Sequence, residues 1–260
     1  MLYNYLVCCY GSLKGKNMSE ENDIRINKYL SQSGVCSRRE ADRIIEQGLV
    51  FVNDNVATLG TRVSADDKVF VDGKLISNNE KEVVLMFNKP VGIECTTDLS
   101  NKDNIISFIN YKSRVFMVGR LDKNSEGLIL LTNNGELSDK LMRAANYHEK
   151  EYLVTVDKTI TKDFIKGMSE GVPIVDEEHG LDTVTRKCMV TKVNDKTFKI
   201  VLTQGLNRQI RRMCKYFGYN VVTLKRVRIM NINIGNLKVG QYREVTKEEL
   251  KILKDNLGLN

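Results

Sequence analysis

The side chains best suited to chemistry lie in residues 207–218, a segment whose spacing predicts an amphipathic helix. Its apolar positions recur at helical spacing: Ile210, Met213, Cys214 and Phe217. Its cations follow the same spacing, displaced by two residues: Arg208, Arg211, Arg212 and Lys215. At about 100° per residue the two sets lie on nearly opposite faces, with Asn207 and Gly218 available as caps. Such a face could hold a phosphate backbone or pair with a buried carboxylate, and a solvated charged surface is the plain alternative.

A single carboxylate occupies a tight loop between two apolar runs. Gly119 and Gly127 bracket this loop, which is expected to present Arg120 and Asp122 at the edge of a sheet. A carboxylate in that position is a candidate for chemistry. Its spacing is equally consistent with a turn residue that pairs with a neighbouring cation, so the loop alone assigns no function.

The positive charge of the chain is concentrated in one segment. Lys and Arg number 40 against 33 Asp and Glu, a net charge of +7. Residues 196–243 hold eleven of the cations and no acid, so the remainder has 29 cations and 33 acids, a net charge of −4. A basic segment in an otherwise acidic protein indicates a polyanion as the partner, with a solubilising surface as the alternative.

Composition disfavours several classes of protein. No apolar run approaches the roughly 18–20 residues that span a bilayer, so membrane association is not expected. His148 and His179 are too few for a multi-histidine metal site, and the six cysteines show no CxxC pair or metal-ligand spacing. Reduced thiols and a cytoplasmic location are the expectation. No G-x-G-x-x-G follows a predicted strand, so no nucleotide cofactor is expected. The few histidines and the cysteine spacing likewise give no reason to expect a metal.

The apolar pattern predicts an α+β protein with two domains. Five segments are expected: an N-terminal extension without order (1–22), a small domain (23–74), a linker (75–82), a larger domain (83–252) and a C-terminal tail (253–260). Whether the natural start is Met1 or Met18 is left open. Short apolar and alternating runs in the larger domain predict a mixed, mostly antiparallel sheet with few helices.

The small domain is predicted to contain two short helices followed by a small antiparallel sheet. A helix over 24–30 precedes a second one that starts after Ser37, where Glu40 completes a capping box, and ends at Gly48. Four cations lie away from the apolar stripe: Lys28, Arg38, Arg39 and Arg43. Alone, they are equally consistent with solvated surface charge. The motifs within residues 24–72 resemble an S4 RNA-binding domain, and this resemblance implies that the four cations contact RNA phosphates.

Three motifs of the larger domain resemble, in their order, those of pseudouridine synthases of the RsuA/RluB/RluF family. They are Arg120-Leu121-Asp122, Lys150-Glu151-Tyr152 and Asn207-Arg208-Gln209-Ile210-Arg211-Arg212-Met213. An S4 domain ahead of the catalytic domain is that family's architecture. Residues 148–154 and 204–214 look most like the RluF-type subgroup, which modifies 23S ribosomal RNA.

This resemblance implies roles for individual side chains. Asp122 would act on a flipped-out uridine as nucleophile or base, at C1′ of the ribose or C6 of the uracil. Tyr152 would pack on the uracil, Arg211 would pair with the aspartate, and Arg120 would help to keep the nucleotide flipped out. The remaining cations of these motifs are expected to contact RNA: Lys150, Arg208, Arg212 and Lys215. The Asp–Arg pairing is physically reasonable, because a partly desolvated carboxylate needs a cation to stay ionised.

Together these expectations describe a cofactor-free isomerisation of one uridine in 23S ribosomal RNA, or in an assembly intermediate, by a monomeric protein. A tRNA as second substrate is left open. The main alternative is a non-catalytic S4-containing RNA-binding or ribosome-assembly protein, which would not need Asp122, Tyr152 and Arg211 together. An S4-bearing methyltransferase would need a glycine-rich cofactor loop, and a metal nuclease would need clustered carboxylates in its basic segment. The sequence has neither.

Overall fold

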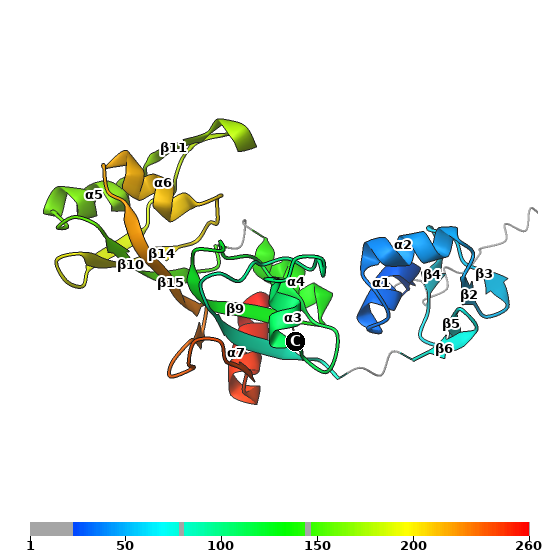
Figure 1. Cartoon of the computed structure of the whole chain (residues 1–260). Coiled ribbons are helices and arrows are strands. Elements are labelled where there is room, and N and C mark those ends of the chain that lie inside the picture. The colour runs from blue at the N-terminus through cyan, green and yellow to red at the C-terminus, as the bar shows by residue number, and fades with distance from the viewer. Residues whose placement is uncertain (1–22, 78–80, 144–146, 260) are drawn as a thin grey trace, which may run out of the picture. The chain divides into compact units, whose positions relative to one another are not determined.

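The structure, a computed structural model, describes residues 23–77, 81–143 and 147–259. The chain divides into two compact units, residues 1–80 and 81–260 (Figure 1). The predicted extension over 1–22 lies outside the described residues, together with both candidate starts. Of the predicted linker, Ile76 still belongs to a strand, and residues 78–80 also lie outside the described part.

The smaller unit packs two helices against short strands, which confirms the predicted arrangement. Its elements are β1 Ile24–Arg25, α1 Ile26–Gln32, α2 Arg38–Glu46, β2 Val50–Val52, β3 Asn55–Val56, β4 Arg62–Val63, β5 Val69–Val71 and β6 Lys74–Ile76. Strands β3, β2, β5 and β6 form an antiparallel sheet in that order, and β1 pairs with β4. Buried apolar side chains from both helices and the sheet share one core, among them Ile26, Leu30, Ile45 and Val69.

Two local details of this unit differ from the prediction. The first helix begins at Ile26 because the two residues before it form β1. The hydroxyl of Ser37 accepts a hydrogen bond from the amide of Glu40 at 3.1 Å, as expected of a cap. The carboxylate of Glu40 pairs with Arg43, however, and does not complete the capping box. The i,i+3 partner competes for it on the exposed helix surface.

The larger unit is built on one mixed sheet, as predicted. Its strands are β7 Val84–Lys89, β8 Phe116–Val118, β9 Glu126–Thr132, β10 Lys150–Val156, β13 Met189–Lys192, β14 Thr197–Leu202, β15 Val221–Ile229, β16 Ile232–Asn233 and β17 Tyr242–Glu244. The main order is β13-β14-β10-β15-β9-β7-β17, with β8 beside β9 and β16 beside β15. Among the described strands of this sheet only β9 and β15 pair in parallel, where the two halves of the sheet meet.

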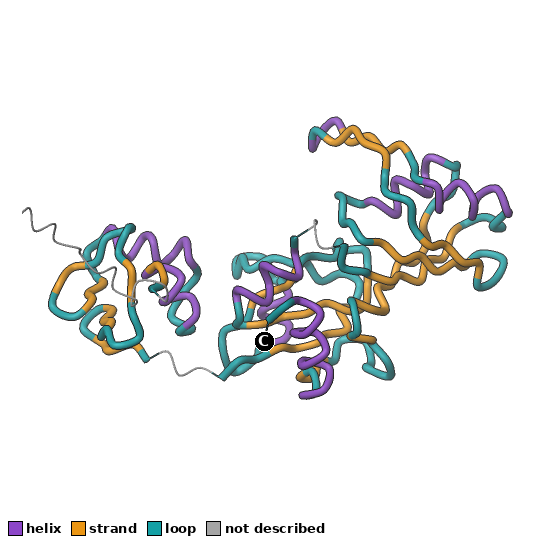
Figure 2. The backbone as a smooth tube through the Cα atoms, turned by 180° about the vertical axis from the view of Figure 1, so that it is seen from behind, coloured by secondary structure: helices purple, strands orange, loops and turns teal. Residues whose placement is uncertain are grey.

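Helices cover both faces of this sheet (Figures 1 and 2). They are α3 Ile105–Ile109, α4 Gly135–Met142, α5 Lys162–Glu170, α6 Gln209–Tyr216 and α7 Lys247–Leu257. Apolar side chains of α4 and α7 share a core with one face of β7 and β9, and α3 packs on the other face. Helices α5 and α6 share a core with β10 and β14.

The C-terminal tail predicted over 253–260 is wrong for its first residues. Helix α7 continues to Leu257, and Leu253 and Leu257 are buried in the core beside α4. These two leucines have the i,i+4 spacing of a helix face, so burial of that face extends the helix. The prediction ended the domain too early.

A β-hairpin extends from the sheet beside α6. It consists of β11 Pro173–Asp176 and β12 Leu181–Val184 (Figure 1). The guanidinium of Arg212 on α6 forms an ion pair with Asp176 and donates to the carbonyl of Val175 at 3.0 Å. A side chain predicted to bind RNA therefore ties the hairpin to the helix.

Candidate active site

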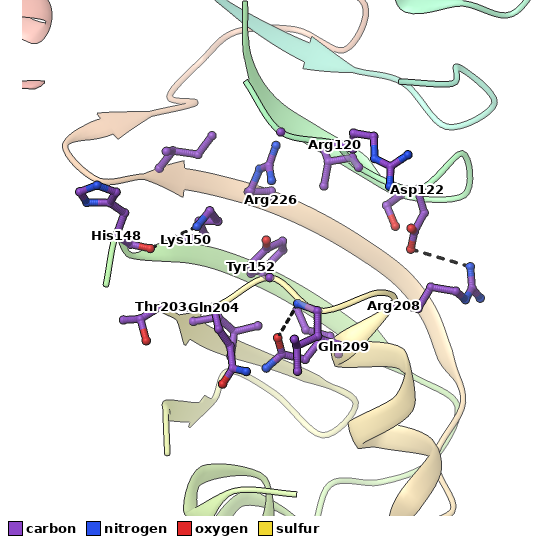
Figure 3. Close-up of a pocket in the computed structure, with 18 of the residues that line it drawn as sticks. Arg120, Asp122, His148, Lys150, Tyr152, Thr203, Gln204, Arg208, Gln209 and Arg226 are labelled. Carbon is purple, nitrogen blue, oxygen red and sulfur yellow. Dashed lines mark hydrogen bonds and ion pairs between the residues drawn. The ribbon is translucent and has the colours of Figure 1, made fainter. Parts of the chain in front are cut away.

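The three predicted motifs meet around one cavity of about 230 Å³. Its walls come from the loop after β8, from β10 and β15, and from the start of α6 (Figure 3). Arg120, Asp122, Lys150, Tyr152 and Arg211 all line it. Segments almost 90 residues apart in sequence thus place one carboxylate, one aromatic ring and several cations around the same space.

Asp122 stands at the mouth of this cavity between two guanidinium groups. Its Oδ2 lies 3.8 Å from Nη1 of Arg208 and 3.9 Å from Nε of Arg211. The side chain is 36% exposed, so solvent and a ligand can both reach it. Both separations are longer than a hydrogen bond, and the carboxylate keeps its lone pairs available while it is held in a positive field.

Arg211 connects the loop of Asp122 to helix α6. Its Nη2 donates to the carbonyl of Asn124 at 2.8 Å and to Oγ of Ser125 at 3.3 Å, and its Nη1 donates to the carbonyl of Val221 at 3.3 Å. Burial lowers the pKa of Arg211, and the neighbouring Arg208 lowers it further, whereas Asp122 acts in the opposite direction. The planar fork of an arginine fits this task, because one side chain both charges the site and fixes its loop.

Arg208 has an unusual backbone that the sequence did not reveal. It occupies the cap position of α6 in the left-handed region, with φ of 48°, and no side chain caps the helix. The predicted cap by Asn207 is therefore wrong. A non-glycine residue in this region costs on the order of 1–3 kcal/mol, which the surrounding contacts must offset. The strained backbone directs the side chain of Arg208 toward Asp122, as Figure 3 shows.

The inner part of the cavity is formed by β10 and β15. Tyr152 is 8% exposed and is the direct cross-strand partner of Arg226, itself 3% exposed. Lys150 lies two residues before Tyr152 on the same face of β10, and its Nζ donates to the carbonyl of His148 at 3.3 Å. Burial lowers the pKa of Lys150, as does the nearby charge of Arg226.

Arg226 was not predicted as a site residue. Tyr152 pairs with Arg226 while the adjacent Glu151 pairs with Arg228, so Val227 is an extra residue and β15 has a bulge. The two arginines would share a face in a regular strand, but the bulge separates them. Arg226 enters the cavity, and Arg228 pairs with Glu149 and Glu151 instead. The position of Arg226 in the basic segment was the signal in the sequence that could have indicated a role in the site. The bulge that directs it into the cavity could not be predicted.

The loop of Asp122 is also supported from outside the cavity. Nζ of Lys123 pairs with Glu94 at 3.0 Å and with Asp103 at 2.9 Å, and these acids raise the pKa of the lysine. The fully buried Lys89 donates to the carbonyls of Pro90 and Ile93 beneath the loop. Lys123 therefore fixes the loop through Glu94 and Asp103.

The other predicted RNA-binding residues divide into three groups. Lys215 is exposed on α6, whereas the guanidinium of Arg212 forms an ion pair with Asp176, which competes with the predicted phosphate contact. In the smaller unit Arg38, Arg39 and Arg43 are exposed and Lys28 is half-buried.

Two further features concern ligands and membranes. No helix within the described ranges is long and apolar enough to cross a bilayer. Nor do any three His, Cys, Asp or Glu side chains of those ranges gather as a metal site.

Comparison with known proteins places these features in context. Residues 83–216 match the family model described as RNA pseudouridylate synthase, and residues 24–69 match the S4 domain. The chain is 55% identical over 235 residues to the dual-specificity RNA pseudouridine synthase RluF of Escherichia coli K12, with 90% of this chain and 79% of the relative covered. It is 30% identical over 233 residues to the ribosomal large subunit pseudouridine synthase B of Bacillus subtilis, with 88% and 95% covered.

Solved structures include one similar fold of closely matching length. A crystal structure of a pseudouridylate synthase superposes with a TM-score of 0.64 at 26% identity, and the match covers 88% of this chain and 99% of that one.

Proposed function

The chain belongs to the RNA pseudouridylate synthase family and carries an S4 domain, and from this we propose that Asp122 is the residue through which it isomerises uridine in 23S ribosomal RNA. The observation that carries the proposal is the position of Asp122. Among the described side chains that line the cavity, Asp122 is the only carboxylate. It lies between Arg208 and Arg211, and Tyr152 lies deeper in the same cavity.

The geometry is consistent with a target nucleotide that leaves its RNA helix. Extrusion of a base costs a few kcal/mol, and stacking on an aromatic ring returns about 1–3 kcal/mol. Tyr152 would offer that ring, and Arg120 would help to keep the nucleotide in the cavity. Asp122 would then act at C1′ of the ribose or C6 of the uracil. The product is an isomer of the substrate, formed without net oxidation or hydrolysis, so the reaction consumes no co-substrate.

RNA recognition would involve both units of the protein. We propose that Arg208 and Lys215 contact phosphates near the target, and that the S4 cations Lys28, Arg38, Arg39 and Arg43 contact RNA elsewhere. The ribosomal name of the Bacillus relative supports large-subunit RNA, or an assembly intermediate, as substrate. The dual specificity in the name of the Escherichia coli relative supports a second RNA, for which a tRNA is our proposal. A monomer acting in the cytoplasm is part of the same proposal.

The non-catalytic alternative explains less of the site. An RNA-binding or assembly protein needs exposed cations, which the S4 domain already supplies. It has no use for a carboxylate that two arginines hold at the mouth of a cavity, since an acid there repels phosphate. The high identity to named synthases favours the catalytic function as well.

The substitution Asp122→Asn tests this proposal directly. The variant keeps the size and shape of the side chain but cannot act as nucleophile or base. We expect pseudouridine formation in 23S RNA transcripts to slow by at least about 10³-fold, with RNA affinity nearly unchanged. Asp163→Asn, an exposed carboxylate in the first turn of α5, is the matched control and should retain full activity. Modification by Asp122→Asn at the wild-type rate would remove the catalytic assignment.

A further inference from the structure

The inner end of the cavity holds two cations for which the described part of the chain supplies no acid. Arg226 is 3% exposed, and its Nε donates to the carbonyl of Leu128 at 2.6 Å, which fixes the plane of the guanidinium. Its Nη2 is buried and has no hydrogen-bond partner within the described residues. Within the described residues Lys150 makes one hydrogen bond, to the carbonyl of His148, and no carboxylate there lies within ion-pair distance of either side chain.

Another arginine of the same strand, Arg228, is fully paired. Arg228 donates to Glu151 at 3.1 Å, to Glu149 at 2.9 Å and to the carbonyl of Met230 at 2.8 Å. A buried charge without such partners is costly, and two like charges side by side add repulsion. The bulge at Val227 nevertheless separates Arg226 from these acids and directs it into the cavity. The cost is explained if a ligand supplies the missing negative charge.

The position of the two cations indicates which part of a ligand they meet. Arg226 lies beside Tyr152 on the neighbouring strand, and Lys150 lies two residues from Tyr152 on the same strand face. Figure 3 shows these three side chains near one another and away from Asp122 and Arg208. Tyr152 and Arg226 are almost fully buried, whereas the side chains of Asp122 and Arg208 are 36% and 47% exposed, so the three form the inner part of the cavity. A base stacked on Tyr152 would therefore direct its polar edge at Arg226 and Lys150. The exposed cations Arg208 and Lys215 are better placed for phosphates.

We propose that Arg226 and Lys150 bind a carbonyl oxygen of the target uracil and stabilise the negative charge that the base acquires during the reaction. This inference rests on the proposed function. Donors that are fixed in advance and directed at developing charge are among the strongest contributions to catalysis, and more so where water is excluded. The tether to Leu128 and the burial of Arg226 meet both conditions.

The charge arises on the base whichever carbon Asp122 attacks. Attack at C1′ breaks the bond to N1, and its electron pair spreads over N1, O2 and O4 of the released uracil. Attack at C6 moves the C5–C6 electron pair toward C4 and O4. In both cases the N1–C1′ bond breaks and C5 bonds C1′. The bond between Asp122 and the substrate then breaks, which restores the carboxylate, while the C5 proton is lost and N1 gains one, so atoms and electrons balance. Two cations at the carbonyl edge would serve either route.

Single-turnover kinetics of three variants test the inference. Arg226→Gln and Lys150→Gln should each slow the chemical step by about 10²–10³-fold, while the affinity for RNA changes less than about threefold. Arg226→Lys should recover part of the rate. Arg228→Gln removes a cation from the opposite face of the same strand and is the control; it should lower stability and leave the chemical step intact.

Sulfur-substituted RNA gives a reading that a purely structural role would not affect. With 2-thiouridine or 4-thiouridine at the target, sulfur replaces one carbonyl oxygen and accepts hydrogen bonds poorly. Where sulfur replaces the carbonyl oxygen that Arg226 and Lys150 bind, the chemical step of the wild-type protein should become slower. The same replacement should slow the Arg226→Gln variant by a factor at least about fivefold smaller. If Arg226→Gln does not fold, Lys150→Gln carries the same comparison.

The possible outcomes separate this inference from the proposed function. Additive effects of variant and sulfur at both positions would overturn it. So would a chemical rate within about threefold of wild type, or a pure loss of affinity with a lower salt slope, which is the sign of a phosphate contact. If the wild-type protein forms no pseudouridine, the proposed function itself fails. If it does, and Arg226→Gln is equally fast, only this inference is wrong.

Discussion

Replacement of Arg212 by an uncharged residue should destabilise the protein without weakening its binding to RNA phosphates. The side chain lies on the cationic side of α6, where the sequence predicts a phosphate contact. In the structure its guanidinium pairs with Asp176 and donates to the carbonyl of Val175. The carboxylate of Asp176 is only 6% exposed, whereas the Arg212 side chain is 25% exposed. These exposures decide the expected magnitude.

Deleting one member of a buried ion pair typically costs 3–5 kcal/mol, because the other charge stays buried without compensation. Water can reach the partly exposed side of this pair, so we expect Arg212→Met to lower the free energy of unfolding by about 2–3 kcal/mol. Asp176→Asn should cost less, because the arginine that remains is closer to solvent. The double variant should be more stable than the sum of the two single effects predicts, by at least about 1 kcal/mol.

Urea unfolding of the full chain, followed by circular dichroism, measures these energies, and the dependence of RNA affinity on salt measures the phosphate contacts. Lys215→Met is the matched control, since Lys215 is exposed on the same helix. It should leave stability within about 0.5 kcal/mol of wild type and lower the salt slope by about 0.7–0.9. Arg212→Met should lower the stability and leave the salt slope unchanged. A normal stability together with a lower slope for Arg212→Met would refute the structural role.

Two further predictions concern the framework of the site. Gly127→Ala should strongly destabilise the larger unit, because the backbone of Gly127 has φ of 108° and an added Cβ would lie 2.3 Å from the carbonyl oxygen of Arg226. Thermal unfolding measures this loss, and Gly205→Ala is the control, since an added Cβ there meets free space and should cost little. Equal melting temperatures of the two variants would contradict the close approach of β9 to β15. Stability should also fall at alkaline pH, because burial raises the pKa of the Cys214 thiol to about 12 while an unfolded thiol ionises near pH 8.5. The free energy of unfolding of wild type relative to Cys214→Ala should decrease by about 2 kcal/mol between about pH 8 and about pH 10. A constant difference would argue that the thiol ionises as readily in the folded protein as in the unfolded one.

The elements that follow from local pattern could be predicted from the sequence. The apolar residues of the helix over 207–218 recur at the period of a helix, and Ile210, Met213 and Cys214 are indeed buried. The S4-type helix pair and the mostly antiparallel sheet also follow from short-range periodicity and turn residues. Such signals depend on neighbours within a few positions, which a sequence displays directly.

Features that depend on distant partners could not be predicted. Arg212 pairs with an acid 36 positions away on a hairpin that the sequence does not connect to α6. The bulge that directs Arg226 into the cavity exists because β15 pairs with β10, more than 70 residues earlier. The left-handed backbone of Arg208 has no signal either, since glycine or asparagine would be expected at such a position. A basic segment therefore indicated the ligand class but not the role of each cation.

Those roles explain why one segment holds so much positive charge. Among the described side chains that line the cavity, one carboxylate, Asp122, faces six cations: Arg120, Arg143, Lys150, Arg208, Arg211 and Arg226. Only Arg208 and Arg211 approach the carboxylate, and Arg211 also fixes its loop. The excess of positive charge is unfavourable in the protein without RNA and becomes favourable once a nucleotide enters. The phosphate of the nucleotide adds negative charge at the mouth of the cavity, and its base gains negative charge deeper inside during the reaction. If this division is correct, the charge of the mouth governs binding and its salt dependence, and the charge of the inner end governs the rate.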